Sequence, residues 1–390
     1  MALILILSLC SCGKRDTVIT VSDDPVTLPT SETAAETNGD SGGSDGDITI
    51  IMAGDMLLHD PVIESGERED GTLNYDHIFA HTKDIISGAD LAICNQEVIL
   101  GGKELGLSGY PQFNGPFEFG DSLAKAGFDV ILHSSNHTFD RGKKAILNCL
   151  DFWETEHPEI TVCGLYSDKS GSDDICYREV GGYRIAVLNY TYTINSGVRD
   201  EYEADPYMVR ILDEDTIAAD AEKARSEGAD LIVACPHWGV EDSLSVSDDQ
   251  RYWADVFAEN EVDVIFGAHP HVVEPVGTVT SPAGKEIPVY YSVGNFVNAT
   301  AGEGRGVAAR VVGLIAKVVV TAGKDGGLKV SEYTYEPIVT HIGEGEAGIT
   351  VYPLDDYTED LAEENGIIER DDSFSLDYCR ELVEELKVNN

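Results

Sequence analysis

The sequence predicts an α/β protein with a largely parallel core sheet. Its 390 residues and 42% hydrophobic content allow a sizeable core, in one large domain or two ordinary ones. Short apolar runs with β character alternate with helix-compatible stretches, a pattern typical of α/β folds. The expected strands are residues 48–53, 90–94, 129–133, 184–189, 230–235, 263–267 and 288–292. The expected helices are residues 75–88, 117–127, 140–155, 211–227 and 248–260.

The N-terminal segment "MALILILSLCSCGKRD" is a short apolar run that ends in small residues and cysteine. It is shorter than the about 20 apolar residues that a membrane-spanning helix needs, and it is typical of a bacterial lipoprotein signal. Cys12 is the better lipidation candidate, because the small Ser11 precedes it, whereas Leu9 precedes Cys10. We therefore expect a signal peptide over residues 1–12 and a protein lipid-anchored on the extracytoplasmic face of the cell membrane. The alternative is a frayed apolar N-terminus.

Composition divides the rest of the chain into three parts. Residues 13–46 are rich in Ser, Thr, Gly and Asp, which predicts a flexible linker. The main domain is expected over residues 47–341, and it becomes more β-rich after about residue 306. Residues 342–390 form an acidic C-terminal extension that contains one amphipathic helix candidate, "SLDYCRELVEELKV".

The charge balance excludes nucleic acid as a partner. The chain carries 71 acidic and 26 basic residues, for a formal net charge of -45. Such a protein repels nucleic acid and anionic lipid headgroups, because phosphate binding depends on Lys and Arg. If the substrate is anionic, the site itself must supply the positive charge, and a metal ion would do so.

Six cysteines follow the N-terminal segment, and none of them forms a C-x-x-C pair. They are Cys94, Cys149, Cys163, Cys176, Cys235 and Cys379. Most lie in apolar strand-like or helix-like contexts, which predicts buried free thiols. Disulfides are the alternative, and the spacing does not choose among the pairings.

The strand ends carry the candidate functional residues. In open α/β folds, ligands bind at the carboxyl ends of strands. Five of the expected strands are followed by carboxylates, amides or imidazoles, and turn chemistry alone does not explain this recurrence. These residues are Asp55 and His59, Asn95 and Glu97, Asn136, His137 and Asp140, His237 and Glu241, and His269 and His271. Mixed oxygen and nitrogen donors favour Zn, Mn or Fe over Ca or Mg, and there are enough for two metal ions.

The ordered series "GD", "CNQE", "SNHTFDRG", "CPHWGVE", "GAHPHV" and "YSVGNF" resembles the CapA (PgsA) family of capsule-synthesis proteins, linked to poly-γ-glutamate. The resemblance covers roughly residues 47–300. That family is similar to the calcineurin-like metallophosphoesterases. The resemblance implies a four-layer α/β/β/α metallophosphatase-like sandwich with a two-metal site at the strand ends.

The resemblance also implies a role for each residue of the motifs. Asp55 and His271 would bind the first metal, and Glu97 would bridge the two ions. The second metal would be bound by Asn136, His237 and His269. His137 matches the histidine that protonates the leaving group, with Asp140 orienting it. Ser292 and Asn295 are expected to have turn or supporting roles.

Two positions depart from the phosphoesterase pattern. Met56 and Leu57 follow Asp55, so the histidine of the usual D-x-H motif is absent, and His59 is the residue that would replace it from the loop. Glu97 replaces a bridging aspartate by a longer side chain. Both departures leave it open whether the site is catalytic.

The resemblance implies a lipid-anchored protein of poly-γ-glutamate synthesis or export that works with the membrane subunits of that complex. Its substrate would be an anionic polymer or a phosphoester. The alternative is a non-catalytic accessory subunit whose metal site is structural or binds polymer carboxylates. A third interpretation is a secreted α/β domain with structural histidines.

Overall fold

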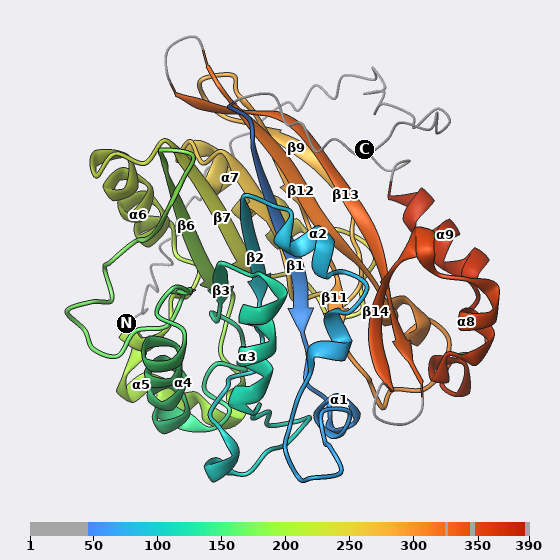
Figure 1. The fold of residues 1–390 in the computed structure, drawn as a ribbon. Helices are drawn as coiled ribbons and strands as arrows, with labels where there is room; N and C mark the ends of the chain where they lie inside the picture. The colour runs from blue at the N-terminus through green and yellow to red at the C-terminus, as the bar shows by residue number, and fades with distance from the viewer. Residues whose placement is uncertain (1–45, 324–326, 344–347, 387–390) are drawn as a thin grey trace, which may run out of the picture.

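The computed structural model describes residues 46–323, 327–343 and 348–386 (Figure 1). The expected signal peptide with Cys12 and almost all of the expected linker 13–46 lie outside the described residues. Within the described residues, no helix is both long enough and apolar enough to cross a membrane. The six cysteines of this part of the chain are free, and all but the half-buried Cys176 are buried.

The described strands form two mixed sheets. The first has the order β14 (Ile349–Pro353), β13 (Leu328–Ile342), β12 (Val312–Ala322), β1 (Ile48–Met56), β2 (Leu91–Asn95), β3 (Val130–Leu132) and β4 (Thr161–Cys163), and β11 (Asn295–Val297) pairs with β1. The second has the order β5 (Cys176–Val180), β6 (Tyr183–Thr191), β7 (Leu231–His237), β8 (Val264–Phe266), β10 (Glu286–Tyr290) and β9 (Val276–Thr280). The strands predicted from sequence are therefore divided between two sheets, where strand–helix alternation alone predicted one largely parallel sheet.

Helices cover the outer faces of both sheets (Figure 1). On the first sheet lie α1 (Asp60–Glu64), η1 (Asp76–Phe79), α2 (Lys83–Ser87), α3 (Phe117–Ala126) and α4 (Gly142–Glu156). On the second sheet lie α6 (Glu214–Ser226) and α7 (Asp248–Glu259). The short helices of the connections are η2 (Lys103–Leu105), η3 (Ser196–Val198), α5 (Arg199–Ala204), η4 (Pro206–Met208) and η5 (Val307–Val311).

The four layers pack together through three apolar cores. The alternation of side chains along each strand explains how one sheet contributes to two cores. Side chains alternate between the two faces of a strand. In β1, Ile50 and Met52 point into the core between the two sheets, whereas Ile51 and Ala53 belong to the core under α3 and α4. In β7, Val233 joins the core between the sheets, and its neighbour Ala234 packs under α6 and α7. The fold is thus the expected four-layer α/β/β/α sandwich.

The acidic segment 342–390 is packed into the domain as far as it is described. Its strand β14 pairs antiparallel with β13. After β14 come η6 (Leu354–Asp356), α8 (Glu359–Glu364), η7 (Gly366–Glu369) and α9 (Leu376–Glu385). Ala362, Cys379 and Leu382 of this segment join the same core as the facing sides of the two sheets.

Candidate metal centre

Strand ends from both sheets converge on one buried cluster of polar side chains. β1 and β2 run parallel, so Asp55 and Asn95 lie side by side in register, and Glu97 follows two residues later. β7 and β8 are parallel neighbours in the second sheet and bring His237 next to the "GAHPHV" loop. The carboxyl ends of these strands meet where the two sheets face each other, as expected for ligand sites of α/β folds.

The cluster contains overlapping sets of potential metal-ligand atoms. In the described part of the chain, one set is Asp55, Glu97 and His271, and another is Glu97, His237 and His269; within each set these atoms lie within 4.8 Å of one another. The structure thus brings together the residues assigned from sequence to the first and the second metal, with Glu97 shared between them. That they bind metal remains a prediction. A third set adds the exposed Glu241 to His269 and His271.

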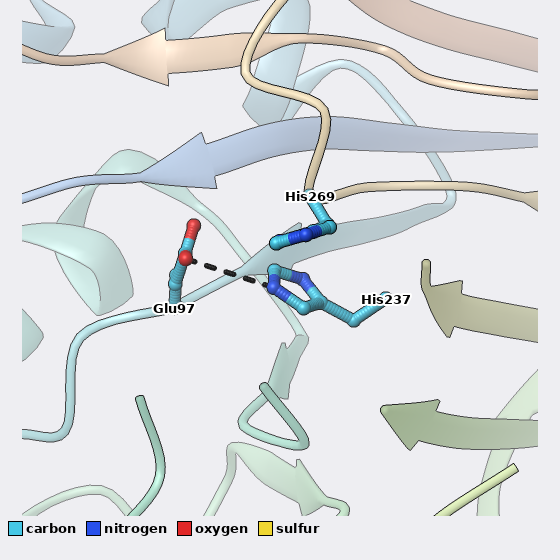
Figure 2. Close-up of side chains that lie close together, drawn as sticks. All are labelled: Glu97, His237 and His269. Carbon is cyan, nitrogen blue, oxygen red and sulfur yellow. Dashed lines mark ion pairs between the residues drawn. The ribbon is translucent and has the colours of Figure 1, made fainter. Parts of the chain in front are cut away.

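Glu97 provides the sharpest test of whether these residues fit a cation. Its side chain is fully buried, and neither carboxylate oxygen has a hydrogen-bond partner. His237 Nε2 lies 3.6 Å from Glu97 Oε1 (Figure 2). The buried Nδ1 of His269 also has no partner. Since buried polar atoms are nearly always hydrogen-bonded, these unpartnered oxygens and nitrogen fit metal ligation.

Neighbouring polar groups hold the other candidate ligands in place. Asp55 accepts hydrogen bonds from Asn95 Nδ2 (2.6 Å) and from the backbone N–H of His269 (3.1 Å). His237 accepts at Nδ1 from Asn95 Nδ2 (3.2 Å) and donates from Nε2 to Asn136 Oδ1 (2.8 Å). Such supporting contacts orient ligating side chains in known metal sites.

The electrostatics of the cluster reflect its crowded buried charges. Burial lowers the pKa of His271, but the carboxylates of Glu97 and Asp55 outweigh burial and raise it to about 10. Burial raises the pKa of Glu97, yet His271 and His237 hold it well below its usual range. Burial, with His237 and His271 beside it, lowers the pKa of His269 well below its usual value. Without a metal, an ionised Glu97 therefore faces a protonated His271.

The "GAHPHV" loop has a strained backbone. His269 and His271 have φ angles of 99° and 62°, in the left-handed region that residues other than glycine rarely adopt. Such conformations cost on the order of 1–3 kcal/mol each and concentrate at functional sites. Pro270 lies between the two histidines, whose ring centroids are 5.7 Å apart. Asn295 Oδ1 accepts from His271 Nδ1 (3.0 Å), which gives Asn295 an orienting role.

His137 and Asp140 form a buried pair beside the cluster. His137 Nδ1 donates to Asp140 Oδ2 at 2.6 Å, and Asp140 Oδ2 also accepts from the backbone N–H of Phe113. Because a carboxylate only accepts, this bond fixes the proton on Nδ1 and leaves Nε2 as the ring's second nitrogen. The ring of Phe113 packs edge-on against His137 at 4.8 Å.

His59, the possible replacement for the missing motif histidine, lies outside the ligand sets of the described residues. It accepts at Nδ1 from the backbone N–H of Ala299 (3.4 Å), and burial lowers its pKa to about 4.

The sequence analysis missed two residues beside the cluster, Tyr192 and Asn195. The ring of Tyr192 lies 4.6 Å from that of His269, and Asn195 accepts a hydrogen bond from Asn136. Strand β6 ends at Thr191, two residues later than expected, so reading its true end would have pointed to both.

Two facing mixed sheets with helices on both outer faces define a four-layer α/β/β/α protein, and a histidine–carboxylate cluster lies at its strand ends. More specifically, the chain belongs to the family "Bacterial capsule synthesis protein PGA_cap", whose model matches residues 49–300. It is 29% identical over 176 residues to "PGA biosynthesis protein CapA" of Bacillus subtilis (strain 168), covering 45% of this chain and 44% of the relative. It is 26% identical over 257 residues to "Capsule biosynthesis protein CapA" of Bacillus anthracis, covering 64% of this chain and 59% of the relative. The chain thus spans about half the length of these relatives.

Solved structures give more distant likenesses. The NAD nucleotidase NadN of Haemophilus influenzae aligns with a TM-score of 0.47 at 13% identity, covering 87% of this chain and 67% of that chain. The calcineurin-like phosphoesterase YfkN of Bacillus subtilis aligns with a TM-score of 0.41 at 14% identity, covering 88% of this chain and 99% of that chain.

Proposed function

We propose that this capsule-synthesis protein holds two divalent metal ions, of Mn, Zn or Fe, and hydrolyses a phosphoester. The observation that carries the proposal is Glu97, a buried carboxylate without hydrogen bonds that is shared by two sets of potential ligands. A buried charge of this kind is costly unless a cation compensates it. Membership of the PGA_cap family supports a place in capsule polymer synthesis.

Each side chain of the cluster has a task in this proposal. Asp55 and His271 would hold one ion, Asn136, His237 and His269 would hold the other, and Glu97 would contact both. When bound, the ions would supply positive charge and Lewis acidity toward an anionic phosphoester group. The same charge would offset the repulsion expected from a protein of net charge -45.

His137 would transfer the proton to the leaving group. Asp140 holds the proton of the ring on Nδ1, so that Nε2 is free to receive and donate a proton. The ring of Phe113 restricts the rotation of His137. His137 lies beside the cluster, because the preceding residue, Asn136, accepts a hydrogen bond from His237.

Replacing His137 with glutamine is expected to lower kcat toward p-nitrophenyl phosphate by roughly 100-fold or more, because the general acid is lost. Metal content should stay the same. The matched control is His157→Gln, which changes a histidine bonded to Asp121 and Glu159 at the end of α4. Steady-state kinetics and elemental analysis of both variants check the prediction. Loss of metal in His137→Gln, with no separate effect on kcat, would give His137 a ligand-supporting role.

An accessory role is the second candidate, and the acidity of the chain favours it. A protein with 71 acidic residues would need metal ions to bind the carboxylates of a γ-glutamyl polymer. In that role the chain would assist membrane subunits of a synthesis or export complex, without turnover. Metal-loaded protein that hydrolyses neither phosphomonoesters nor phosphodiesters would support this candidate against the enzyme.

We further infer a lipid anchor at Cys12 and a location on the extracytoplasmic face of the membrane. The support is the N-terminal sequence, since Cys12 lies outside the described residues. Cells that express the full chain should incorporate a clickable palmitate analogue into it, and Cys12→Ser should abolish the label. Labelling that survives Cys12→Ser but is lost in Cys10→Ser would move the anchor to Cys10.

A further inference from the structure

A large groove opens beside the candidate metal centre. It has a volume of about 1010 Å³ and lies between α1, η1, the end of β13, β14 and η7. We call it the η1–β14 groove; the lining residues that matter below are His59, His81, Tyr110, His341, Tyr352 and Arg370. Its volume exceeds what a phosphate group needs and is at the upper end of small-ligand sites. The groove can therefore hold a substantial part of a substrate.

One end of the groove lies against the metal centre. His59 lines the groove and packs edge-on against Phe113 at 5.5 Å. Phe113 in turn contacts His137 of the site at 4.8 Å and Tyr110 of the groove at 6.2 Å. His59 accepts a backbone hydrogen bond at Nδ1, so its neutral ring carries the proton on Nε2. Two ring contacts, from His59 to Phe113 and from Phe113 to His137, therefore connect the groove wall to the candidate metal centre.

The charges of the groove do not favour a polyanion. Its lining includes the carboxylates of Asp60, Glu364 and Glu369 and one arginine, Arg370. That arginine is already paired, since its Nη1 lies 3.1 Å from Glu303. Burial lowers the pKa of His341, so its imidazole adds no positive charge at neutral pH. A chain of carboxylates would be repelled here.

Aromatic rings and neutral polar groups provide the other contacts. His81 stacks on Tyr352 with ring centroids 4.0 Å apart and an interplanar angle of 20°. Tyr110 also lines the groove, and its large aromatic side chain is 73% exposed. Flat rings pack against the apolar C–H faces of sugar rings, while carboxylates and imidazoles accept hydrogen bonds from sugar hydroxyls.

We propose that the η1–β14 groove binds an uncharged oligosaccharide, the non-reacting part of a glycosyl phosphoester whose phosphate reaches the metal centre. The inference rests on the proposed function, since it names the substrate class of the same site. It places sugar rings on His81 with Tyr352 and on Tyr110, and it makes the γ-glutamyl chain a poor ligand of this groove.

Isothermal titration of the purified full chain tests the inference. The probes are cellotetraose, maltotetraose and tetra-N-acetylchitotetraose, with a γ-linked glutamate tetramer for comparison. At least one tetrasaccharide should bind, and the double variant His81→Ala/Tyr352→Ala should weaken it by roughly tenfold. His81→Ala alone, which truncates an exposed side chain and should not affect folding, should weaken it by a smaller factor. Tyr252→Ala, a control on the exposed face of α7, should leave binding unchanged.

Two results would overturn the inference. One is the absence of binding for all three tetrasaccharides. The other is tighter binding of the γ-glutamyl tetramer that is lost in the His81→Ala/Tyr352→Ala variant, which would make the groove a site for the anionic polymer. Failure of the proposed function is a separate result, because it is read from metal content and phosphatase turnover. The groove residues His81 and Tyr352 belong to no ligand set of the described residues.

Discussion

Replacing Glu97 with glutamine is expected to reduce divalent-metal affinity by at least about 100-fold, because the substitution removes the charge shared by both ligand sets. Purified wild-type protein should contain Mn, Zn or Fe by elemental analysis, and Glu97→Gln should contain little or none. The loss should persist after incubation with excess metal followed by desalting. Isothermal titration of the metal-free proteins would measure the difference in affinity directly.

A second buried glutamate supplies the control. Glu274 is also fully buried with one unpartnered carboxylate oxygen, and burial raises its pKa to about 7. Its other oxygen accepts from Gln250, and in the described structure it belongs to no ligand set. Glu274→Gln should therefore retain metal. Retention of metal by Glu97→Gln, or a metal-free wild-type protein that is fully folded, would refute the metal centre.

The protonation of His271 adds a pH dependence to metal binding. The pKa of His271 is raised to about 10, so at neutral pH its ring is an imidazolium with protons on both nitrogens. A histidine binds a metal through an unprotonated ring nitrogen, so the metal competes with the second proton of this imidazolium. Apparent affinity should rise with pH by up to roughly tenfold per unit below that pKa. An affinity that is constant between about pH 6 and about pH 8 would show that His271 does not bind the metal.

Replacing Gly54 with alanine is expected to destabilise the protein by more than about 3 kcal/mol and to remove the metal. A Cβ atom at this position would lie 1.9 Å from the carbonyl oxygen of Gly294. Both atoms of the clash are held by backbone geometry, so rotation of a side chain cannot relieve it. Relief requires β1 to separate from β11, and Asp55 and Asn295 at this contact would move apart. Urea unfolding and elemental analysis measure the two effects.

Gly197→Ala is the matched control for this substitution. A Cβ atom on Gly197 would meet no atom within 4 Å, and the residue lies in the short helix η3. Its midpoint of urea unfolding should match that of the wild type. A Gly54→Ala protein of wild-type stability with full metal content would contradict the close approach of β1 and β11.

The sequence predicted most of the site because strand ends can be recognised one segment at a time. Glu97, His237, His269 and His271 each follow an apolar run that forms a buried strand. Tyr192 and Asn195 were missed because β6 continues to Thr191, beyond the expected end at residue 189. His59 could not be placed from sequence, since its direction depends on how the loop after β1 packs against Ala299.

The sequence by itself determined the seven expected strands, most of the expected helices, the polar residues at the strand ends and the family, because each depends on local periodicity or on ordered motifs. The helix expected over residues 75–88 is instead divided into η1 and α2. Only the tertiary structure decided which segments face one another. It divides the strands between two sheets, and it brings the N–H of His269 to Asp55 across 214 positions of the chain. It also sets the left-handed backbone of His269 and His271 and assembles a groove from residues between His59 and Arg370. The physical reason is that hydrophobic periodicity reports the burial of a segment and not its partner, which long-range packing selects.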